Sequence, residues 1–420
     1  MAALREANVY ERQTYRHLVG LPAILGDIAD PAGLPLIFGL IAVVGLFTAP
    51  ISETHGWGRE VYGFAMAMQN LVWGIAQPFV GMLADKFGPM RVIKAGALLY
   101  AAGLVVMSFA EAPFVIMLGG GVLMGLGIAT TSFAIVMAAF GRIVPPEKRS
   151  WAFGVATAAG SMGQFVFAPI GYAFIAAYGW QIALLLLAGS CLLMILIALP
   201  LGASKGGVAR GETEVDITLG QAIRSALGHT SFVLLVVGFF VCGFQIAFIT
   251  VHLPPYLIER GVSFAVAAWA IGVVGLFNVI GSYAAGVYGG YYSKRYGLAF
   301  IYFARSLVLV AFLLTPISAV SAILFTAAMG LLWLSTVPLT MGLVTVMFGT
   351  RYMATLYGFA FFSHQVGSFL GVWLGAWFYD QYGSYDPVWW MSVALGLAAA
   401  LLHWPIREER AGAFVVAPAR

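Results

Sequence analysis

Long apolar runs constrain this sequence more than any other feature. Twelve of them follow one another, each near the roughly 20 residues that a helix needs to cross a bilayer core of about 30 Å. Hydrophobic residues make up 61% and charged residues 9% of the 420 positions, whereas soluble domains carry about 25% charged residues. The runs lie near 32–50, 62–84, 92–110, 113–140, 153–178, 181–200, 232–257, 265–290, 298–315, 320–346, 354–378 and 387–406.

The character of these runs predicts the fold class and excludes others. They are continuous, whereas the strands of a membrane β-barrel alternate in polarity over short segments. The chain also has more apolar residues than a soluble protein can bury, because the surface that a soluble fold buries is limited by its size. We therefore predict an all-α membrane protein of twelve transmembrane helices in two six-helix, pseudo-symmetric halves.

The distribution of basic residues predicts the orientation in the membrane. With the N-terminus inside, only Arg59 and Arg260 of the 21 Lys and Arg residues fall in outside loops. Basic residues favour the cytoplasmic side, so we expect a multi-pass protein of the cytoplasmic (inner) membrane with both termini in the cytoplasm. Charged residues through the first 30 positions argue against a cleavable secretory signal. The net charge of +4 then reflects orientation and does not indicate a nucleic-acid partner.

Two glycine series indicate an internal duplication. Gly154, Gly163, Gly171 and Gly179 recur at an offset of 204 as Gly358, Gly367, Gly375 and Gly383, and Gly63, Gly81 and Gly88 recur at an offset of 209 as Gly272, Gly290 and Gly297. Parallel repeats of this kind place a solute site near the midplane between the halves. We divide the chain into an N-terminal segment (1–31), a first half (32–200), a linker (201–231), a second half (232–406) and a tail (407–420), with a short surface helix at 218–227.

The segment GMLADKFGPMR, from Gly81 to Arg91, carries the strongest local signal. Asp85 ends the second run at the inner surface, where it can meet the positive N-terminal end of a neighbouring helix beside Arg351. We predict that this pair acts as a gate between the halves, against the plainer alternative of a solvated loop. The segment resembles the loop signature of the major facilitator superfamily, which implies the twelve-helix fold and alternating access.

The second-half counterpart of this loop departs from that signature. In the stretch from Gly290 to Gly297, Lys294 stands where Asp85 stands in the first half. Because a helix N-terminus repels a cation, an acid should compensate for this lysine. We predict Glu147, just before the fifth run, as its partner in gating.

Longer stretches resemble the monocarboxylate-transporter and oxalate–formate-antiporter branch of that superfamily. They are PISETHGWGREVYGFAMAMQNLVWGIAQPFVG from Pro50, GSMGQFVFAPIG from Gly160 and VCGFQIAFITVHLPPYLIERG from Val241. The resemblance implies a small organic anion, above all a monocarboxylate, as the substrate. Members of this branch place an arginine in the eighth span and in one case a lysine in the eleventh. Here the eighth span has no charged residue, and the eleventh offers His364 and Gln365 instead.

Polar residues inside the spans are the remaining site candidates, because polar groups in lipid are costly and often functional. The substrate-binding candidates are Gln164, Gln245, His252, Asn278, Trp333, His364 and Gln365. His364 leads, since histidine titrates near physiological pH. Asn278 matches Gln69 in the repeat and could equally be a structural hydrogen-bonding residue. We expect Arg305 to extend to the membrane surface, and Cys191 and Cys242 to be packing residues.

Several function classes lack a signature in the sequence. There is no phosphate-binding Gly-x-x-x-x-Gly-Lys-Ser/Thr loop, no cluster with metal-ligand spacing and no charged pair within a span. We therefore predict a monomeric secondary carrier, not an enzyme, that needs no cofactor or metal and could co-transport a proton. Two alternatives stay open: a carrier of a neutral or amphipathic molecule, and a non-transporting sensor or assembly factor.

Overall fold

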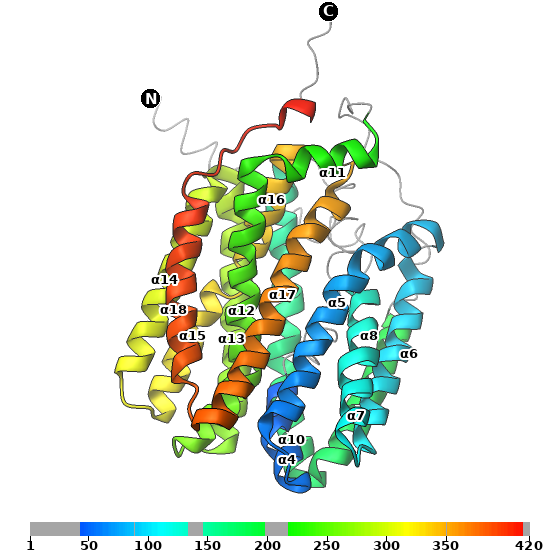
Figure 1. Ribbon diagram of the computed structural model, residues 1–420, viewed down its shortest axis with the longest axis vertical. Helices are drawn as coiled ribbons and strands as arrows, with labels where there is room; N and C mark the ends of the chain where they lie inside the picture. The colour runs from blue at the N-terminus through cyan, green and yellow to red at the C-terminus, as the bar shows by residue number, and fades with distance from the viewer. Residues whose placement is uncertain (1–42, 88, 133–145, 198–216, 350, 415–420) are drawn as a thin grey trace, which may run out of the picture.

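The computed structural model describes residues 43–87, 89–132, 146–197, 217–349 and 351–414. Within these ranges every regular element is helical, and seven of the helices are long and apolar enough to cross a membrane. The helices lie roughly side by side along the long axis of the molecule (Figure 1). This arrangement confirms the predicted all-α membrane fold.

The described part of the first half begins with two short helices that lead into longer ones. Its elements are η1 (Val44–Phe47), α4 (Thr48–His55), α5 (Arg59–Phe87), α6 (Pro89–Ser108), α7 (Pro113–Ile116), η2 (Met117–Leu123), α8 (Met124–Thr130), η3 (Pro146–Lys148) and α10 (Arg149–Ile197). The turn η2 is a π-helix within the predicted fourth span, at a run of three glycines. Helix α10 joins the predicted fifth and sixth spans.

The second half is also built of helices that follow one another along the chain. Its elements are α11 (Leu219–Leu227), α12 (Thr230–Glu259), α13 (Phe264–Tyr291), α14 (Lys294–Leu314), α15 (Ala319–Leu332), α16 (Thr336–Phe348), α17 (Met353–Tyr382), α18 (Asp386–His403) and η5 (Gly412–Phe414). Helix α11 confirms the predicted surface helix. A capping box between Thr218 and Gln221 fixes its start, because each side chain satisfies a backbone N–H of the first turn.

The glycine series marks equivalent ends of equivalent helices. Gly179 interrupts α10 with φ 78°, and Gly383 ends α17 with φ 66°. Both values lie in the region where a side chain would be strained. The break at Gly179 therefore separates the predicted fifth span from the sixth, as Gly383 separates the eleventh from the twelfth.

The predicted tenth span, 320–346, is broken into two helices, whereas the sequence predicted one continuous helix. Helix α15 ends at Leu332 and α16 begins at Thr336. Pro338 lies in the first turn of α16 and has no N–H to donate to the carbonyl four residues earlier. The break leaves carbonyl groups at the end of α15 that need other partners.

The two halves meet along two helix pairs, α5 with α17 and α10 with α13. In Figure 1, α5 and α17 run side by side through the centre, with α6, α7 and α8 to one side and α14, α15 and α18 to the other. A Cβ atom on Gly154 would lie 2.8 Å from the Cα atom of Gly286. Glycine at these positions therefore lets α10 and α13 approach closely.

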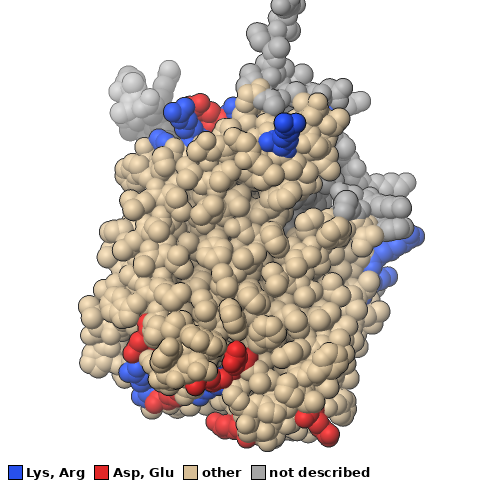
Figure 2. Space-filling model, in the orientation of Figure 1, with Lys and Arg blue, Asp and Glu red and all other residues tan. Residues whose placement is uncertain are grey.

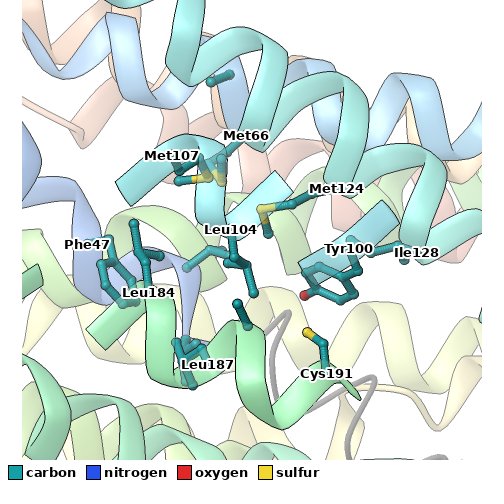
Figure 3. Close-up of a cluster of buried hydrophobic side chains, with 14 of the residues drawn as sticks. Phe47, Met66, Tyr100, Leu104, Met107, Met124, Ile128, Leu184, Leu187 and Cys191 are labelled. Atoms are coloured by element: carbon teal, nitrogen blue, oxygen red, sulfur yellow. The ribbon is translucent and has the colours of Figure 1, made fainter. Parts of the chain in front are cut away.

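Each half also has its own apolar core. In the first half, Met66, Met107 and Met124 pack with Tyr100 and Leu104 between α5, α6 and α8 (Figure 3). Cys191 from α10 lies in the same core, as the sequence predicted. On the face drawn in Figure 2, most charged side chains lie near the two ends, with one basic group at the right edge, and a broad uncharged band lies between the ends. That band has the character of a lipid-facing surface.

Candidate functional site

A polar contact joins the halves near the middle of α5 and α17. The Nδ1 atom of His364 lies 2.8 Å from the Oε1 atom of Gln365. The Nε2 atom of Gln365 donates to the main-chain oxygen of Asn70, at 3.2 Å, in the first half. Since an amide oxygen only accepts, Nδ1 of His364 is the donor in this hydrogen bond. The structure therefore places the predicted site residues His364 and Gln365 in contact with Asn70, which the sequence did not indicate.

Aromatic rings enclose this contact. The imidazole of His364 stacks on Phe361 with ring centroids 5.6 Å apart and lies 4.8 Å from the ring of Phe239. Phe361 in turn contacts Trp73 of α5, at 5.0 Å, and the indole N–H of Trp73 donates to Gln77. His364 remains 9% exposed. The contact thus combines aromatic rings with a few fixed polar groups, which is the usual composition of a small-molecule site.

Arg305 does not extend to the membrane surface, so that prediction was wrong. It lies near the middle of α14, and its side chain is 0% exposed. Its Nε and Nη2 atoms donate to the main-chain oxygen of Leu332, at 3.1 and 2.7 Å, and Nη2 also donates to Trp333 O. These carbonyls are the ones left open by the break between α15 and α16. The side chain is therefore held inward because it caps α15.

Cys242 lies between Arg305 and the contact that His364 and Gln365 make with Asn70, called the central contact below. Nη1 of Arg305 lies 3.5 Å from Cys242 Sγ and 3.4 Å from Gln245 Oε1. The thiol also lies 3.3 Å from the hydroxyl of Thr336 and interacts with His364. Cys242 is thus more than the apolar packing residue that we predicted, because its neighbours are a cation, a hydroxyl and an imidazole.

Asn278 forms a structural cross-link between the halves. Its Nδ2 atom donates to Ser161 Oγ of α10, at 2.8 Å, and its Oδ1 atom accepts the N–H of Leu334 at the α15–α16 break, at 2.9 Å. It also accepts from Ser282. The side chain is fully buried, and these bonds account for it without a ligand. Trp333, beside the same break, packs in the apolar core of the second half.

The other predicted site residues lie away from His364. His252 is fully buried, with Nε2 2.7 Å from the oxygen of Val372. Gln164 lies where α10 packs against Gly275 of α13. Gln245 donates to Ser392 O in α18 and its Oε1 atom lies 3.4 Å from Nη1 of Arg305. The seven candidates are therefore spread over several helix contacts and do not form one cluster.

A second contact joins the halves at the end of the molecule where α5 begins. The carboxylate of Asp380, at the end of α17, accepts the backbone N–H groups of Arg59 and Glu60, at 3.2 and 2.7 Å. The side chain of Arg59 pairs with Glu259 at 2.5 Å and donates to the hydroxyl of Tyr385 at 3.0 Å. A carboxylate at a helix N-terminus is favourable, so α17 caps α5 across the halves.

The electrostatics of Arg59 favour this closed contact. Burial opposes its charge, but contacts with Tyr385, Glu259 and Tyr379 outweigh burial and raise its pKa above the ordinary value. The guanidinium also lies over the ring of Tyr379, 4.1 Å from the centroid. Arg59 therefore stays charged at every physiological pH, and the contact is expected to persist across that range.

The predicted inner gate is only partly covered by the structure. The side chain of Asp85 lies outside the described residues, so its pairing with Arg351 stays a prediction. No ion pair joins Glu147 to Lys294 among the residues that the structure describes. The acid at this loop is Glu408, which accepts from Ser293 Oγ and from the N–H of Arg295, at 2.5 and 2.9 Å. Glu408 thus caps the start of α14, a role that we had not predicted.

Sequence reasoning missed four of the residues that build these contacts: Asn70, Cys242, Arg305 and Arg59. One signal was available, because Pro338 predicts a break in the tenth span, and the open carbonyls of a break need a donor. Arg305 is the strongest donor in the neighbouring span. For Asn70 and Arg59 there was no comparable signal, since their partners lie about 300 residues away in the sequence.

Comparison with known proteins gives a consistent result. The family model of the Major Facilitator Superfamily matches residues 31–372. The uncharacterized MFS-type transporter YcxA of Bacillus subtilis (strain 168) is 25% identical over 395 residues, which are 89% of this chain and 95% of that protein. Monocarboxylate transporter 13 of Bos taurus is 29% identical over 258 residues, 60% of this chain and 58% of that protein. The multidrug resistance protein MdtH of Klebsiella pneumoniae (strain 342) is 26% identical over 396 residues, 91% and 94%.

Proposed function

The chain belongs to the Major Facilitator Superfamily, and from that premise we propose that this transporter carries a small organic anion, most simply a monocarboxylate, by alternating access. The substrate site is the contact of His364 and Gln365 with Asn70. Here the first half meets the second at mid-helix, so a solute between them is exposed to one side or the other as the halves rock.

One observation carries the proposal. At this contact the basic groups are a histidine and, beyond the thiol of Cys242, a buried arginine, and no Asp or Glu lies among the described residues around them. An unpaired anion in an apolar site costs several kcal/mol, so an imidazole that can protonate and a nearby guanidinium favour a carboxylate there. The likeness to bovine monocarboxylate transporter 13 supports the same substrate class.

A second candidate function also has support. The spans carry few charges, and the chain is similar over most of its length to the multidrug resistance protein MdtH. A neutral or amphipathic solute would suit the aromatic walls formed by Phe361, Phe239 and Trp73. This candidate predicts that removing the negative charge from a solute improves its transport.

Other parts of the proposal concern the setting of the carrier. We place it in the cytoplasmic membrane with both termini inside, acting as a monomer, with a proton taken up together with the anion. In this orientation the contact of Arg59 with Asp380 closes the outer end. The Asp85 loop would then close the inner end in the alternate state.

Uptake into proteoliposomes tests the substrate class. Labelled short monocarboxylates should accumulate with saturable kinetics, whereas the corresponding amides, which have the same shape without the charge, should be transported at least about tenfold less efficiently. Empty liposomes provide the background for passive entry of the protonated acids. Equal or faster transport of the amides would contradict the anion proposal and favour the neutral solute.

A further inference from the structure

Arg305 carries a buried positive charge that its neighbours balance only in part. No Asp or Glu within the described ranges forms an ion pair with it, and its side chain is 0% exposed. A guanidinium does not lose its proton under physiological conditions. Burying a charge without a partner costs several kcal/mol. The positions of the partners that Arg305 does have therefore show on which side of the guanidinium its charge is least compensated.

Those partners lie mainly on one side of the guanidinium. Nε and Nη2 donate to Leu332 and Trp333, the last carbonyl groups of α15. A helix C-terminus carries only about half a negative charge, so α15 compensates part of the cation. Among the described residues, Nη1 on the other side lies 3.5 Å from Cys242 Sγ and 3.4 Å from Gln245 Oε1, and the second distance is long for a hydrogen bond to oxygen. The guanidinium carbon also lies 5.3 Å from the centroid of the Tyr302 ring. The uncompensated charge therefore faces Cys242.

Beyond Cys242 lies the central contact. The thiol interacts with His364, which contacts Gln365 and through it Asn70 of the first half. A single side chain thus separates the guanidinium from the site. Charges in a buried, weakly polar environment are screened far less than in water.

We propose that Arg305 determines the anion specificity of the His364–Gln365 site, acting across Cys242 without touching the solute. Its fixed charge favours an anionic group at the site over a neutral group of the same shape. This inference rests on the proposed function, because it assumes that the solute binds between α5 and α17. It differs from the carboxylate clamp that the resemblance implied, since Arg305 lies in another span and is held by a broken helix.

The test compares a labelled monocarboxylate with its amide, used as a competitor, in proteoliposomes. In Arg305→Gln the KM for the carboxylate should rise about tenfold, which corresponds to about 1.4 kcal/mol, while the inhibition constant of the amide stays the same. Arg305→Lys keeps the charge but loses the paired N–H donors of the guanidinium that cap α15. It should slow the transport rate for the carboxylate but preserve the ratio of KM to the amide inhibition constant.

Two further variants separate charge from structure. Asn278→Ala removes a side chain that supports the same helix break without changing any charge, so it should lower the transport rate and leave the ratio unchanged. Gln245→Glu places a carboxylate beside Nη1 and should reduce anion preference with Arg305 still present, which keeps the test valid where Arg305→Gln does not fold. Wild-type selectivity in Arg305→Gln and in Gln245→Glu would overturn the inference. If the wild type transports no carboxylate, the proposed function fails instead.

Discussion

Replacing Arg59 with glutamine should open the end of the molecule where α5, α12, α17 and α18 meet. Arg59 makes three side-chain contacts across the halves: the ion pair with Glu259, the hydrogen bond to Tyr385 and the cation–π contact with Tyr379. Hydrogen bonds of charged groups contribute about 1.5–3 kcal/mol each. Losing about 2 kcal/mol shifts the balance between open and closed forms roughly thirtyfold, so the variant should populate the open form far more than the wild type.

The opening can be measured by the labelling rate of a buried cysteine. Val372 is fully buried in α17 within the core shared with the first half, so a Val372→Cys variant reports separation of the halves when treated with a membrane-impermeant maleimide. Mass spectrometry of that peptide distinguishes it from Cys191 and Cys242. The labelling rate should rise at least about tenfold when Arg59→Gln is added.

Arg260 offers a matched control. It pairs with Asp386 at 3.8 Å, and both residues belong to the second half. Arg260→Gln removes the same charge one residue after Glu259 but no contact between the halves. It should leave labelling at position 372 unchanged. Equal acceleration in both variants, or none in Arg59→Gln, would show that the Arg59 contact does not hold the halves together.

Carboxylate uptake should become about tenfold stronger as the external pH falls from about 7.5 to 5.5, the range that spans the reference pKa of histidine, ~6.5. An anion beside an imidazole favours the protonated ring, so binding takes up a proton and weakens as the pH rises. At the proposed site this imidazole is that of His364, whose Nδ1 is bonded to Gln365. His364→Gln should flatten the pH dependence, and His364→Arg should bind the anion but release it slowly.

Two comparisons make this pH test specific. His252→Gln alters a buried histidine bonded to Val372 and should retain the pH dependence. A sulfonate analogue stays ionised throughout, so a pH dependence that persists with it excludes entry of the protonated acid as the cause. Uptake of the carboxylate that is equally fast over this range in the wild type would refute both the histidine route and the protonated-acid route.

The sequence predicted the architecture well because lipid imposes simple rules on a chain. Long apolar runs gave the helices, and the glycine offsets correctly paired Gly179 with Gly383. The candidate site was only partly predictable. His364 and Gln365 stood out as polar residues in an apolar span, but their contact with Asn70 depends on how two distant helices cross.

Arg305 shows most clearly where the sequence argument fell short. An arginine inside a span can extend toward the membrane surface or turn inward, and the choice depends on partners that the local sequence does not show. Here the open carbonyls of Leu332 and Trp333 hold it inside. Glu408 is a similar case, because it accepts the N–H of Arg295 at the start of α14 from a part of the sequence 113 residues away.

Counterflow in proteoliposomes tests the central claim most directly, because only a carrier whose site faces each side in turn exchanges solute without net flux. Vesicles containing this protein are loaded with an unlabelled monocarboxylate and diluted into a trace of the labelled compound. We expect transient accumulation of label above equilibrium, abolished when the internal solute is omitted. The contradicting result is that the label merely equilibrates, at the same rate with and without internal solute. If every monocarboxylate that enters behaves in this way, the protein does not transport an organic anion by alternating access.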